Sequence, residues 1–503
     1  MNHEDHEETQ ENGYAESVTP RGRFERPTLH FFAVVVVFVG NALALTPTEA
    51  KDLPEPVRAA LARAGVPASA ASVVVEPVAD GPMLVSHEAR APVNPASVMK
   101  LVTTFAALDL LGPAFTFRTD FLLDGTLANG ALDGNLVIRG GGDPKLTYDN
   151  LWRIAHQLRA RGLREIRGDV VIDRSYFAPV AHDPARFDNE PRRAYNVGID
   201  ALLVNFQAVS FTVMPEGDAV RVVAEPDFPN LQVVSRVATT REPCGDWRRN
   251  LKVAIDENGL IATIVFSGTY ATACGEKTWA LSVLDGPRFT EAAIRWLWSE
   301  VGGVLRGKVR AGSAPASATP FYRHESEPLA GLARDMNKYS NNVMARHLFL
   351  ALSAERGSPG EARASERIVR EWLKGRSIDA PEISIENGSG LSRTDRVSAA
   401  TVAAVLRSAW GSALMPELAA SLPVYAVDGT LKTRRGAPAG QAHLKGGTLT
   451  GVQSVAGYVL DARGRRWIAV MIVNHPNAGA AQPALDALVE WVYRQPGKGG
   501  SAR

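Results

Sequence analysis

Three short clusters of serine, lysine and asparagine carry the residue types that nucleophilic catalysis needs. They are Ser97-Val-Met-Lys100, Ser340-Asn-Asn342 and Lys445-Gly-Gly-Thr448. A serine hydroxyl becomes a nucleophile when a neighbouring base takes its proton, and a lysine can be that base when burial lowers its pKa. The clusters therefore indicate acyl transfer to a serine.

The first cluster places a candidate nucleophile and its base on one helix. Residues 97–111 are predicted to be helical, so that Ser97 and Lys100 lie one turn apart on the same face. The apolar residues around the ammonium would desolvate it and let Lys100 accept the serine proton. The simpler alternative is that Ser97 only caps the helix, since a Ser-x-x-Lys pattern arises about once by chance in a chain of this length.

The other two clusters lie where a substrate could reach them. Ser340 and Asn342 fall in the break between two predicted helices, although either residue could instead cap the second one. Lys445-Gly-Gly-Thr448 precedes a terminal hairpin on a predicted edge strand, where glycines let a ligand approach the backbone. A β-turn is the alternative for these residues. The order of the three clusters favours catalysis over these structural roles.

The composition is that of a soluble globular protein. The 503 residues are 45% apolar and 22% charged, which suits about three domains and excludes a collagen, a disordered chain or a multi-span membrane protein. The net charge of +1 indicates no nucleic-acid-binding surface. The ten histidines show no metal-ligand spacing and no nucleotide-binding loop is complete, so no metal or other cofactor is expected.

Residues 1–44 are predicted to be a secretory signal peptide. Three arginines precede an apolar run, Phe31–Gly40, and an Ala-x-Ala cleavage site follows at Ala42–Ala44. The alternative is an uncleaved membrane anchor, because the uncharged run over 29–46 is near the lower length limit for a span. Cleavage would leave a periplasmic chain of net charge about +5, associated at most peripherally with the cell wall or membrane.

Export also affects how the two cysteines are interpreted. Cys244 and Cys274 lie 30 residues apart in a stretch of short predicted strands, and an oxidising compartment permits a disulfide between them. Two buried thiols are the alternative.

The pattern along the mature chain is helix-rich, then β-rich, then helix-rich again. Short alternating strands with glycine and aspartate turns begin near residue 119, and an Ala/Ser/Pro linker over 311–320 precedes the return of helices. We therefore predict an α/β (α+β) fold in which a discontinuous domain, residues 45–118 and 320–497, is interrupted by an inserted β-rich region over 119–319. Outside the insertion, the predicted strands are 71–76, 82–87, 453–460 and 467–474, and the predicted helices are 97–111, 328–338, 342–354, 360–374, 399–408 and 483–493.

Together the clusters resemble the class C low-molecular-mass penicillin-binding proteins, the D-alanyl-D-alanine carboxypeptidase/endopeptidase family. Penicillin-recognising enzymes carry Ser-x-x-Lys, a Ser-x-Asn type element and Lys-Thr-Gly in this order. The 243 residues from Ser97 to Ser340 are typical of this family, which inserts extra domains there. Further stretches that resemble it are Gly134–Pro144, Gly168–Asp173, Met336–Asn342, Asn387–Arg393 and Val427–Leu431.

The resemblance implies a penicillin-binding-protein/β-lactamase-like domain and a catalytic role for three side chains. Ser97 would attack the carbonyl between two D-alanines and form an acyl-enzyme, with Lys100 as its general base. Ser340 would relay a proton to the leaving amine, helped by Lys445. The backbone N–H groups of Ser97 and Thr448 would form an oxyanion hole, which contributes several kcal/mol in comparable sites.

One position of the implied binding site departs from the family. Gly446 stands where the family has Thr or Ser, which removes a hydroxyl expected to bind the terminal carboxylate of D-Ala-D-Ala or of a β-lactam, at a cost of about 1.5–3 kcal/mol. Thr448, Arg393 or a water could replace that hydrogen bond. Alternatively, the preferred substrate has moved towards internal cross-links, which lack the carboxylate. The residues with an implied substrate-binding role are Asn342, Lys445, Gly447, Thr448 and Arg393.

The resemblance therefore implies a serine-type D-Ala-D-Ala carboxypeptidase/endopeptidase that acts on peptidoglycan stem peptides and is bound covalently by β-lactams. One alternative is a serine β-lactamase, which the long insertion and the lack of a deacylating glutamate after Ser97 disfavour. The other is a catalytically weak peptidoglycan-binding or sensor protein of the same fold, which the intact serines and lysines disfavour.

Overall fold

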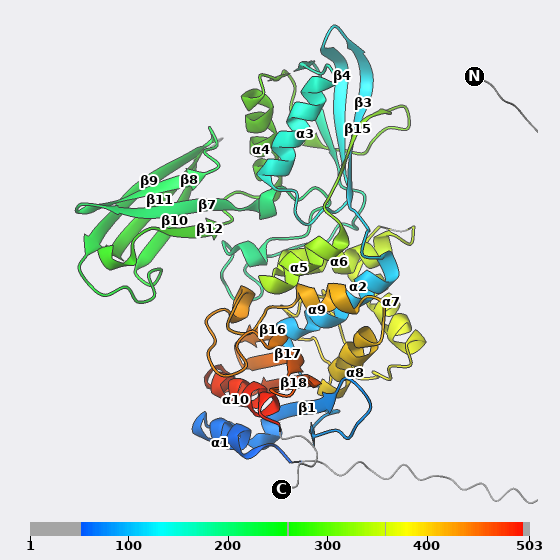
Figure 1. Ribbon diagram of the computed structural model, residues 1–503. Coiled ribbons are helices and arrows are strands. Elements are labelled where there is room, and N and C mark those ends of the chain that lie inside the picture. The colour runs from blue at the N-terminus through cyan, green and yellow to red at the C-terminus, as the bar shows by residue number, and fades with distance from the viewer. Residues whose placement is uncertain (1–51, 259–260, 358, 496–503) are drawn as a thin grey trace, which may run out of the picture. The chain divides into compact units, whose positions relative to one another are not determined.

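The computed structural model describes residues 52–495, apart from 259–260 and 358 (Figure 1). The predicted signal peptide over 1–44 lies outside these residues. Within the described part of the chain, no helix has both the length and the apolar composition needed to cross a membrane.

A five-stranded antiparallel sheet joins the beginning of the described chain to its end. Its order is β16-β17-β18-β1-β2, from β1 (Ala71–Pro77), β2 (Val85–His87), β16 (Ala442–Leu449), β17 (Val452–Leu460) and β18 (Arg466–Asn474). The N-terminal strand β1 pairs with β18 in a register that sets Val74 opposite Val470. The prediction that Lys445 lies on an edge strand is confirmed, because β16 ends the order.

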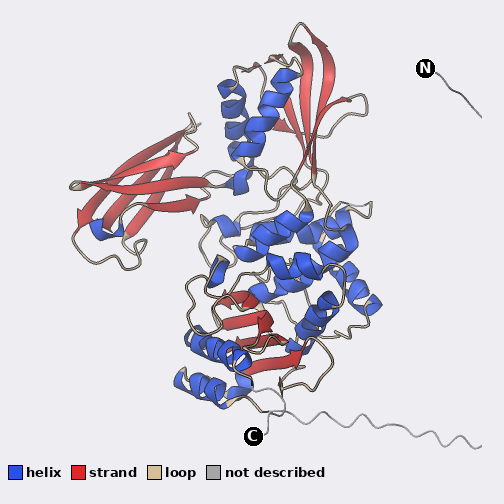
Figure 2. Cartoon of the chain, viewed as in Figure 1, coloured by secondary structure: helices blue, strands red, loops and turns tan. Residues whose placement is uncertain are grey.

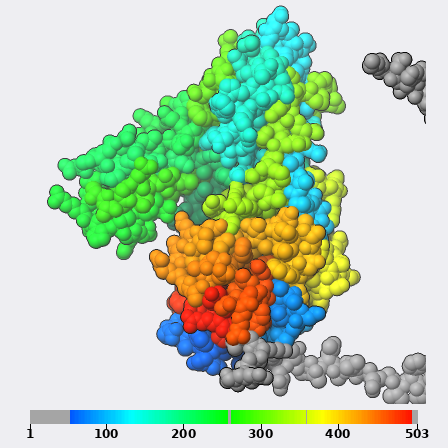
Figure 3. Space-filling model, viewed as in Figure 1, coloured from blue at the N-terminus to red at the C-terminus, as the bar shows by residue number. Residues whose placement is uncertain are grey.

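Both faces of this sheet are covered by helices. Side chains alternate along a strand, so Val73 and Val75 of β1 face one apolar cluster and Val74 faces the other. The helices are α1 (Glu55–Arg63) and α10 (Gln482–Tyr493) on one face, and α2 (Met99–Leu111) and α8 (Ala399–Trp410) on the other. The blue α1 and the red α10 lie side by side (Figure 3).

The helix α2 is buried from Met99 to Leu108, which explains why its sequence has no polar face. It is packed among helices from the second half of the chain: α5 (Leu329–Lys338), α6 (Asn342–Ala354), α7 (Ala362–Gly375) and α8. The short helix α9 (Met415–Ser421) packs on α5. The 3₁₀ turn Ala96–Val98 precedes α2 and contacts β16, so α2 brings its first residues to the edge of the sheet.

Between Arg118 and Glu325 the chain forms two further sheets (Figure 2). The first has the main order β13-β5-β4-β3-β15, and β6 pairs with β4 and β14. Its strands are β3 (Arg118–Ala128), β4 (Ala131–Gly140), β5 (Glu165–Ile166), β6 (Val170–Asp173), β13 (Val304–Leu305), β14 (Val309–Ala311) and β15 (Thr319–Glu325). Side chains of α3 (Tyr148–Ala160) and α4 (Gly286–Glu300) share an apolar cluster with this sheet.

The second inserted sheet has six strands and contains a disulfide. Its order is β10-β11-β9-β8-β7-β12, from β7 (Val209–Glu216), β8 (Ala219–Glu225), β9 (Leu231–Thr240), β10 (Leu251–Asn258), β11 (Ile261–Ala271) and β12 (Lys277–Leu281). Cys244 and Cys274 are joined in a disulfide with their Cα atoms 4.8 Å apart. The disulfide allowed by the sequence is thus present, and the two-thiol alternative is wrong.

The helix-rich, β-rich, helix-rich order is confirmed, but several elements are absent from the sequence prediction. These are α1, α9, β5, β7, β9, β12, β13, β14 and β15. The strand β15 begins inside the predicted linker over 311–320. Its Pro320 is compatible with a strand because β15 is an edge strand and its pairing with β3 is irregular between Pro320 and Tyr322. The domain bounds at 118/119 and 319/320 stay a prediction.

Candidate active site

Ser97 lies in the 3₁₀ turn before α2 rather than at the cap of that helix. The N-cap residue of α2 is Val98, and no side chain caps this end. The capping alternative for Ser97 is therefore wrong. A loop passes close by, because a Cβ on Gly390 would collide with the carbonyl oxygen of Ala96, and Gly390 itself has φ +76°.

Lys100 is completely buried and forms hydrogen bonds to three separate segments of the chain. Its Nζ donates hydrogen bonds to Ser97 Oγ at 3.1 Å, to Asn342 Oδ1 at 2.6 Å and to the carbonyl oxygen of Ser389 at 2.6 Å. Three acceptors hold the amine in a fixed place one turn from Ser97, as the helical spacing predicts. The amine is therefore positioned to exchange a proton with the Ser97 hydroxyl.

The surroundings of Lys100 favour its neutral form. Burial holds the pKa of Lys100 well below its usual range, and the positive charges of Lys445 and Arg346 lower it further. Asp395 opposes them. This carboxyl is itself completely buried, and burial raises its pKa to about 6. Lys100 is thus suited to act as a base near neutral pH.

Lys445 and Ser340 form a second pair. Lys445 Nζ donates to Ser340 Oγ at 2.8 Å and to the carbonyl oxygen of Gly446 at 2.7 Å. Lys445 is completely buried, and burial lowers its pKa to about 7. Ser340 occupies the turn between α5 and α6 with φ +57°, a left-handed conformation that a non-glycine residue adopts only when its surroundings enforce it.

The Ser340 turn also decides which asparagine meets Lys100. Asn341 is the N-cap residue of α6, and its Oδ1 accepts a hydrogen bond from the backbone nitrogen of Met344 at 3.0 Å. Asn342 begins the helix and leaves its side chain for Lys100. The capping alternative is therefore wrong for Ser340 and Asn342, since the residue between them has that role.

The two glycines of β16 differ in their surroundings. A Cβ on Gly447 would lie 2.8 Å from the backbone nitrogen of Ser97, so the strand passes directly beside the Ser97 turn. A Cβ on Gly446 would meet only Leu431 Cδ2 at 3.6 Å among side chains, which leaves room for a substituent. Thr448 is exposed, and its Oγ1 donates to Gln453 Oε1 at 3.1 Å.

Arg393 lies beyond the end of β16. Its Nη1 donates to the carbonyl oxygen of Thr450 at 3.0 Å, and its guanidinium lies 4.7 Å from the centre of the Phe187 ring. No hydrogen bond joins Arg393 to Ser97, Lys100 or Lys445 among those of the described residues. It thus borders the cluster at the Thr448 end of the strand.

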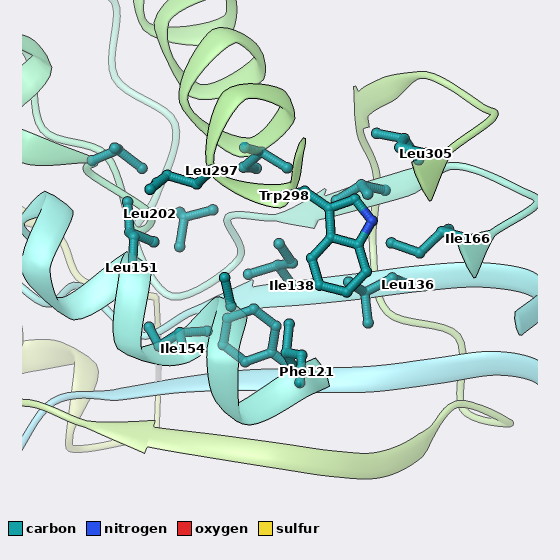
Figure 4. Close-up of a pocket in the computed structure, with 15 residues that line it drawn as sticks. Phe121, Leu136, Ile138, Leu151, Ile154, Ile166, Leu202, Leu297, Trp298 and Leu305 are labelled. Atoms are coloured by element: carbon teal, nitrogen blue, oxygen red, sulfur yellow. The ribbon is translucent and has the colours of Figure 1, made fainter. Parts of the chain in front are cut away.

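The structure adds residues that the sequence analysis does not single out individually. The carbonyl of Ser389 and the charges of Arg346 and Asp395 surround Lys100. Ser389 belongs to the stretch Asn387–Arg393, and the resemblance of that stretch to the family is the sequence feature that could have identified it. An apolar cavity of about 50 Å³ lies elsewhere, since Leu136, Ile154, Trp298 and its other lining residues all belong to the inserted region between residues 121 and 305 (Figure 4).

Comparison with known proteins identifies similar chains. The sequence matches the family described as "D-Ala-D-Ala carboxypeptidase 3 (S13) family" over residues 53–495. D-alanyl-D-alanine carboxypeptidase DacB of Haemophilus influenzae is 28% identical over 396 residues, covering 76% of this chain and 81% of that protein. A D-alanyl-D-alanine carboxypeptidase of Actinomadura sp. is 29% identical over 453 residues, covering 86% and 83%.

A solved structure shares the fold. Penicillin binding protein 4 (dacB) from Haemophilus influenzae matches with a TM-score of 0.69 and 25% identity, covering 84% of this chain and 96% of that one. The predicted α/β fold with a penicillin-binding-protein/β-lactamase-like domain is confirmed by this match.

Proposed function

The chain belongs to the D-Ala-D-Ala carboxypeptidase 3 (S13) family, and from this premise we propose that it is a serine-type D-Ala-D-Ala carboxypeptidase/endopeptidase of peptidoglycan peptides that is acylated by β-lactams. The observation that carries the proposal is the position of buried Lys100 between Ser97 Oγ and Asn342 Oδ1. A neutral amine at this point can take a proton only from a group beside it, and the Ser97 hydroxyl is that group.

Acylation begins with Ser97. Lys100 accepts the proton of the hydroxyl while Ser97 Oγ bonds to the carbonyl carbon of the penultimate D-alanine. The negative charge that develops on the carbonyl oxygen is received by the backbone N–H groups of Ser97 and Thr448. The close approach of Gly447 to the Ser97 turn supports this pairing, because it sets the two backbone segments side by side.

The leaving group departs next to the second pair. The carbon–nitrogen bond breaks, and the leaving amine receives a proton from Ser340, which regains one through Lys445. The hydrogen bond of 2.8 Å from Lys445 Nζ to Ser340 Oγ supports this route. The proton that Lys100 took from Ser97 then passes to the Lys445–Ser340 pair and replaces the one given to the leaving amine, so Lys100 is neutral again. Water attacks the acyl carbonyl carbon while Lys100 takes its proton, and that proton passes to Ser97 Oγ as the ester bond breaks.

Substrate binding involves Asn342, Lys445, Gly447, Thr448 and Arg393. Asn342 holds the amide of the acyl side, and Arg393 borders the Thr448 end of β16, where its contact with the Thr450 carbonyl supports a role in binding. Gly446 lacks the hydroxyl that would bind a terminal carboxylate, and the space beside it favours substrates extended beyond D-alanine. Cross-linked peptides are such substrates, so endopeptidase activity is part of the proposal.

The same proposal places the protein in the periplasm with peripheral association with the cell wall or membrane. The disulfide between Cys244 and Cys274 supports an oxidising compartment. A signal peptide over 1–44 would deliver the chain there.

The proposal is tested by covalent labelling. The protein and its Ser97→Ala variant are incubated with a fluorescent penicillin, and the adduct is located by mass spectrometry. Wild type should carry one adduct on Ser97, and Ser97→Ala none. A matched control is Ser398→Ala, which removes an N-cap hydrogen bond from α8 at a cost of about 1 kcal/mol and should still be labelled.

The outcomes separate the alternatives. An adduct on Ser97→Ala would show that another residue is the nucleophile and would refute the mechanism. Rapid release of hydrolysed penicillin without cleavage of a D-Ala-D-Ala peptide would favour the β-lactamase alternative. Absence of both labelling and peptide cleavage in wild type would favour the binding or sensor protein.

A further inference from the structure

Two large apolar side chains are exposed close to the Ser340 turn. Tyr339 is 72% exposed and Val427 is 60% exposed. Among the described residues, the other large apolar side chains with comparable exposure fall between residues 152 and 304, all in the inserted region. Because both lie close to the Ser340 turn, they are accessible to a ligand bound there.

An ion pair holds the two exposed residues on neighbouring segments. Lys338 Nζ donates to Asp428 Oδ2 at 2.6 Å, and Lys338 is almost completely buried. Tyr339 directly follows Lys338, and Val427 directly precedes Asp428. A Cβ on Gly429 would lie 2.5 Å from the carbonyl oxygen of Lys338, so the two backbones are in contact as well.

The loop that carries Val427 is also fixed to the catalytic strand. The backbone nitrogen of Leu444 donates to the carbonyl oxygen of Pro423 at 2.9 Å. Further along, Cδ2 of Leu431 would lie in van der Waals contact, at 3.6 Å, with a Cβ on Gly446. The segment from 423 to 431, which we call the rim loop, therefore borders β16 beside Lys445 and Gly446.

The rim loop lies at the end of the site where the leaving group departs. In the proposed mechanism Ser340 protonates the leaving amine, so the leaving group lies beside Ser340 and Lys445. The next residue outward in the turn is Tyr339, and the rim loop faces it across the Lys338–Asp428 ion pair.

We propose that Tyr339 and Val427 form a subsite for the leaving strand of a cross-linked peptide, held in place by the Lys338–Asp428 ion pair. The inference rests on the proposed function. A cross-link is an amide between a D-alanine carbonyl and a side-chain amine of a second stem peptide, so its leaving group carries methylene groups and a further peptide. Tyr339 and Val427 contact those methylene groups, whereas a departing D-alanine is too short to reach them.

The test compares two substrates in one set of variants. Steady-state kcat/KM is measured for a pentapeptide ending in D-Ala-D-Ala and for a cross-linked peptide dimer, in wild type, Tyr339→Ala, Val427→Ser and the double variant. Loss of an apolar contact of this size lowers specificity by about tenfold, so kcat/KM for the dimer should fall about tenfold in each single variant. The value for the pentapeptide should change by less than about twofold. The matched control is Val223→Ser, an exposed valine of β8 in the inserted six-stranded sheet, which should change neither value.

A dimer value that stays at the wild-type level in the double variant would overturn the inference, and so would an equal fall for both substrates. A wild-type protein that cleaves the pentapeptide but not the dimer would also overturn it while leaving carboxypeptidase activity intact. Failure of the proposed function is distinct, because wild type would then cleave neither substrate and would take no penicillin on Ser97.

Discussion

Gly446 and Gly447 are adjacent in β16 but differ in the room around them. A Cβ on Gly447 would lie 2.4 Å from Oγ of Ser454, 2.8 Å from the backbone nitrogen of Ser97 and 3.0 Å from Cβ of Ala96. The nearest side-chain atom to a Cβ on Gly446 is Leu431 Cδ2, at 3.6 Å. Neither glycine has a positive φ, so only the contacts of the added methyl group distinguish the two substitutions. Gly447→Ala therefore tests how closely β16 must approach Ser97.

The size of the effect follows from these distances. To accept a methyl group at 447, the Ser454 hydroxyl must turn away, and β16 and the Ser97 turn must separate by roughly half an ångström. Such overpacking costs about 1–3 kcal/mol of stability. Displacing reacting groups by about 1 Å can cost about 100-fold in rate, so Gly447→Ala should slow acylation by about tenfold to 100-fold. Gly446→Ala should acylate within about twofold of wild type and be as stable or about 0.4–1 kcal/mol more stable, because it restricts only the unfolded chain.

The assay is the second-order rate constant for labelling by a fluorescent penicillin, measured for wild type and both variants. Urea unfolding followed by tryptophan fluorescence reports stability on the same samples. Acylation of Gly447→Ala at the rate of wild type and of Gly446→Ala would refute the reasoning, because β16 would then not need its close approach to Ser97. Equal slowing of both would refute it as well, since Gly446 has the room that Gly447 lacks.

Three further predictions concern stability. Because burial lowers the pKa of Lys445 to about 7, the unfolded chain binds a proton that the folded chain lacks between about pH 7 and 10, so the free energy of unfolding rises with pH there. Lys445→Met should remove about 1.4 kcal/mol of that rise per pH unit. If urea unfolding at pH 8, 9 and 10 gave the same rise for wild type and Lys445→Met, the lowered pKa would be contradicted. Replacing Cys244 and Cys274 by serine should cost about 3–4 kcal/mol, as expected for a closed loop of 30 residues, and should leave penicillin labelling within about twofold of wild type; a loss of labelling would show that the six-stranded sheet supports the active site. Val204→Ile adds a methylene group to the wall of the apolar cavity and should raise the free energy of unfolding by up to about 0.8 kcal/mol in urea unfolding; a decrease would show that the cavity cannot accept the group.

The three candidate catalytic clusters could be found from the sequence because each depends on neighbours within a few residues. The helical period alone puts Lys100 one turn after Ser97, and the structure has that relation. The position of Lys445 on an edge strand follows from the hairpin that comes after it. The sequence also allowed the disulfide between Cys244 and Cys274, since only two cysteines are present.

Several strands escaped prediction because their pattern is set by their partners. The strand β9 pairs in parallel with β11 and carries exposed residues along much of its length, so its alternation is weak. The strand β15 contains Pro320, which indicates a linker when the position of the strand in the sheet is unknown.

The amino-acid sequence by itself determined which residue types are available for chemistry, their local spacing and the order of helix-rich and β-rich regions. Only the tertiary structure decided that Lys100 meets Asn342, 242 residues away, and that Ser389 supplies a carbonyl to the same amine. It also decided that Lys100 and Lys445 are both completely buried. The physical reason is that burial and proximity are made by segments distant in the chain, and the shift of a pKa from its ordinary value depends on those surroundings.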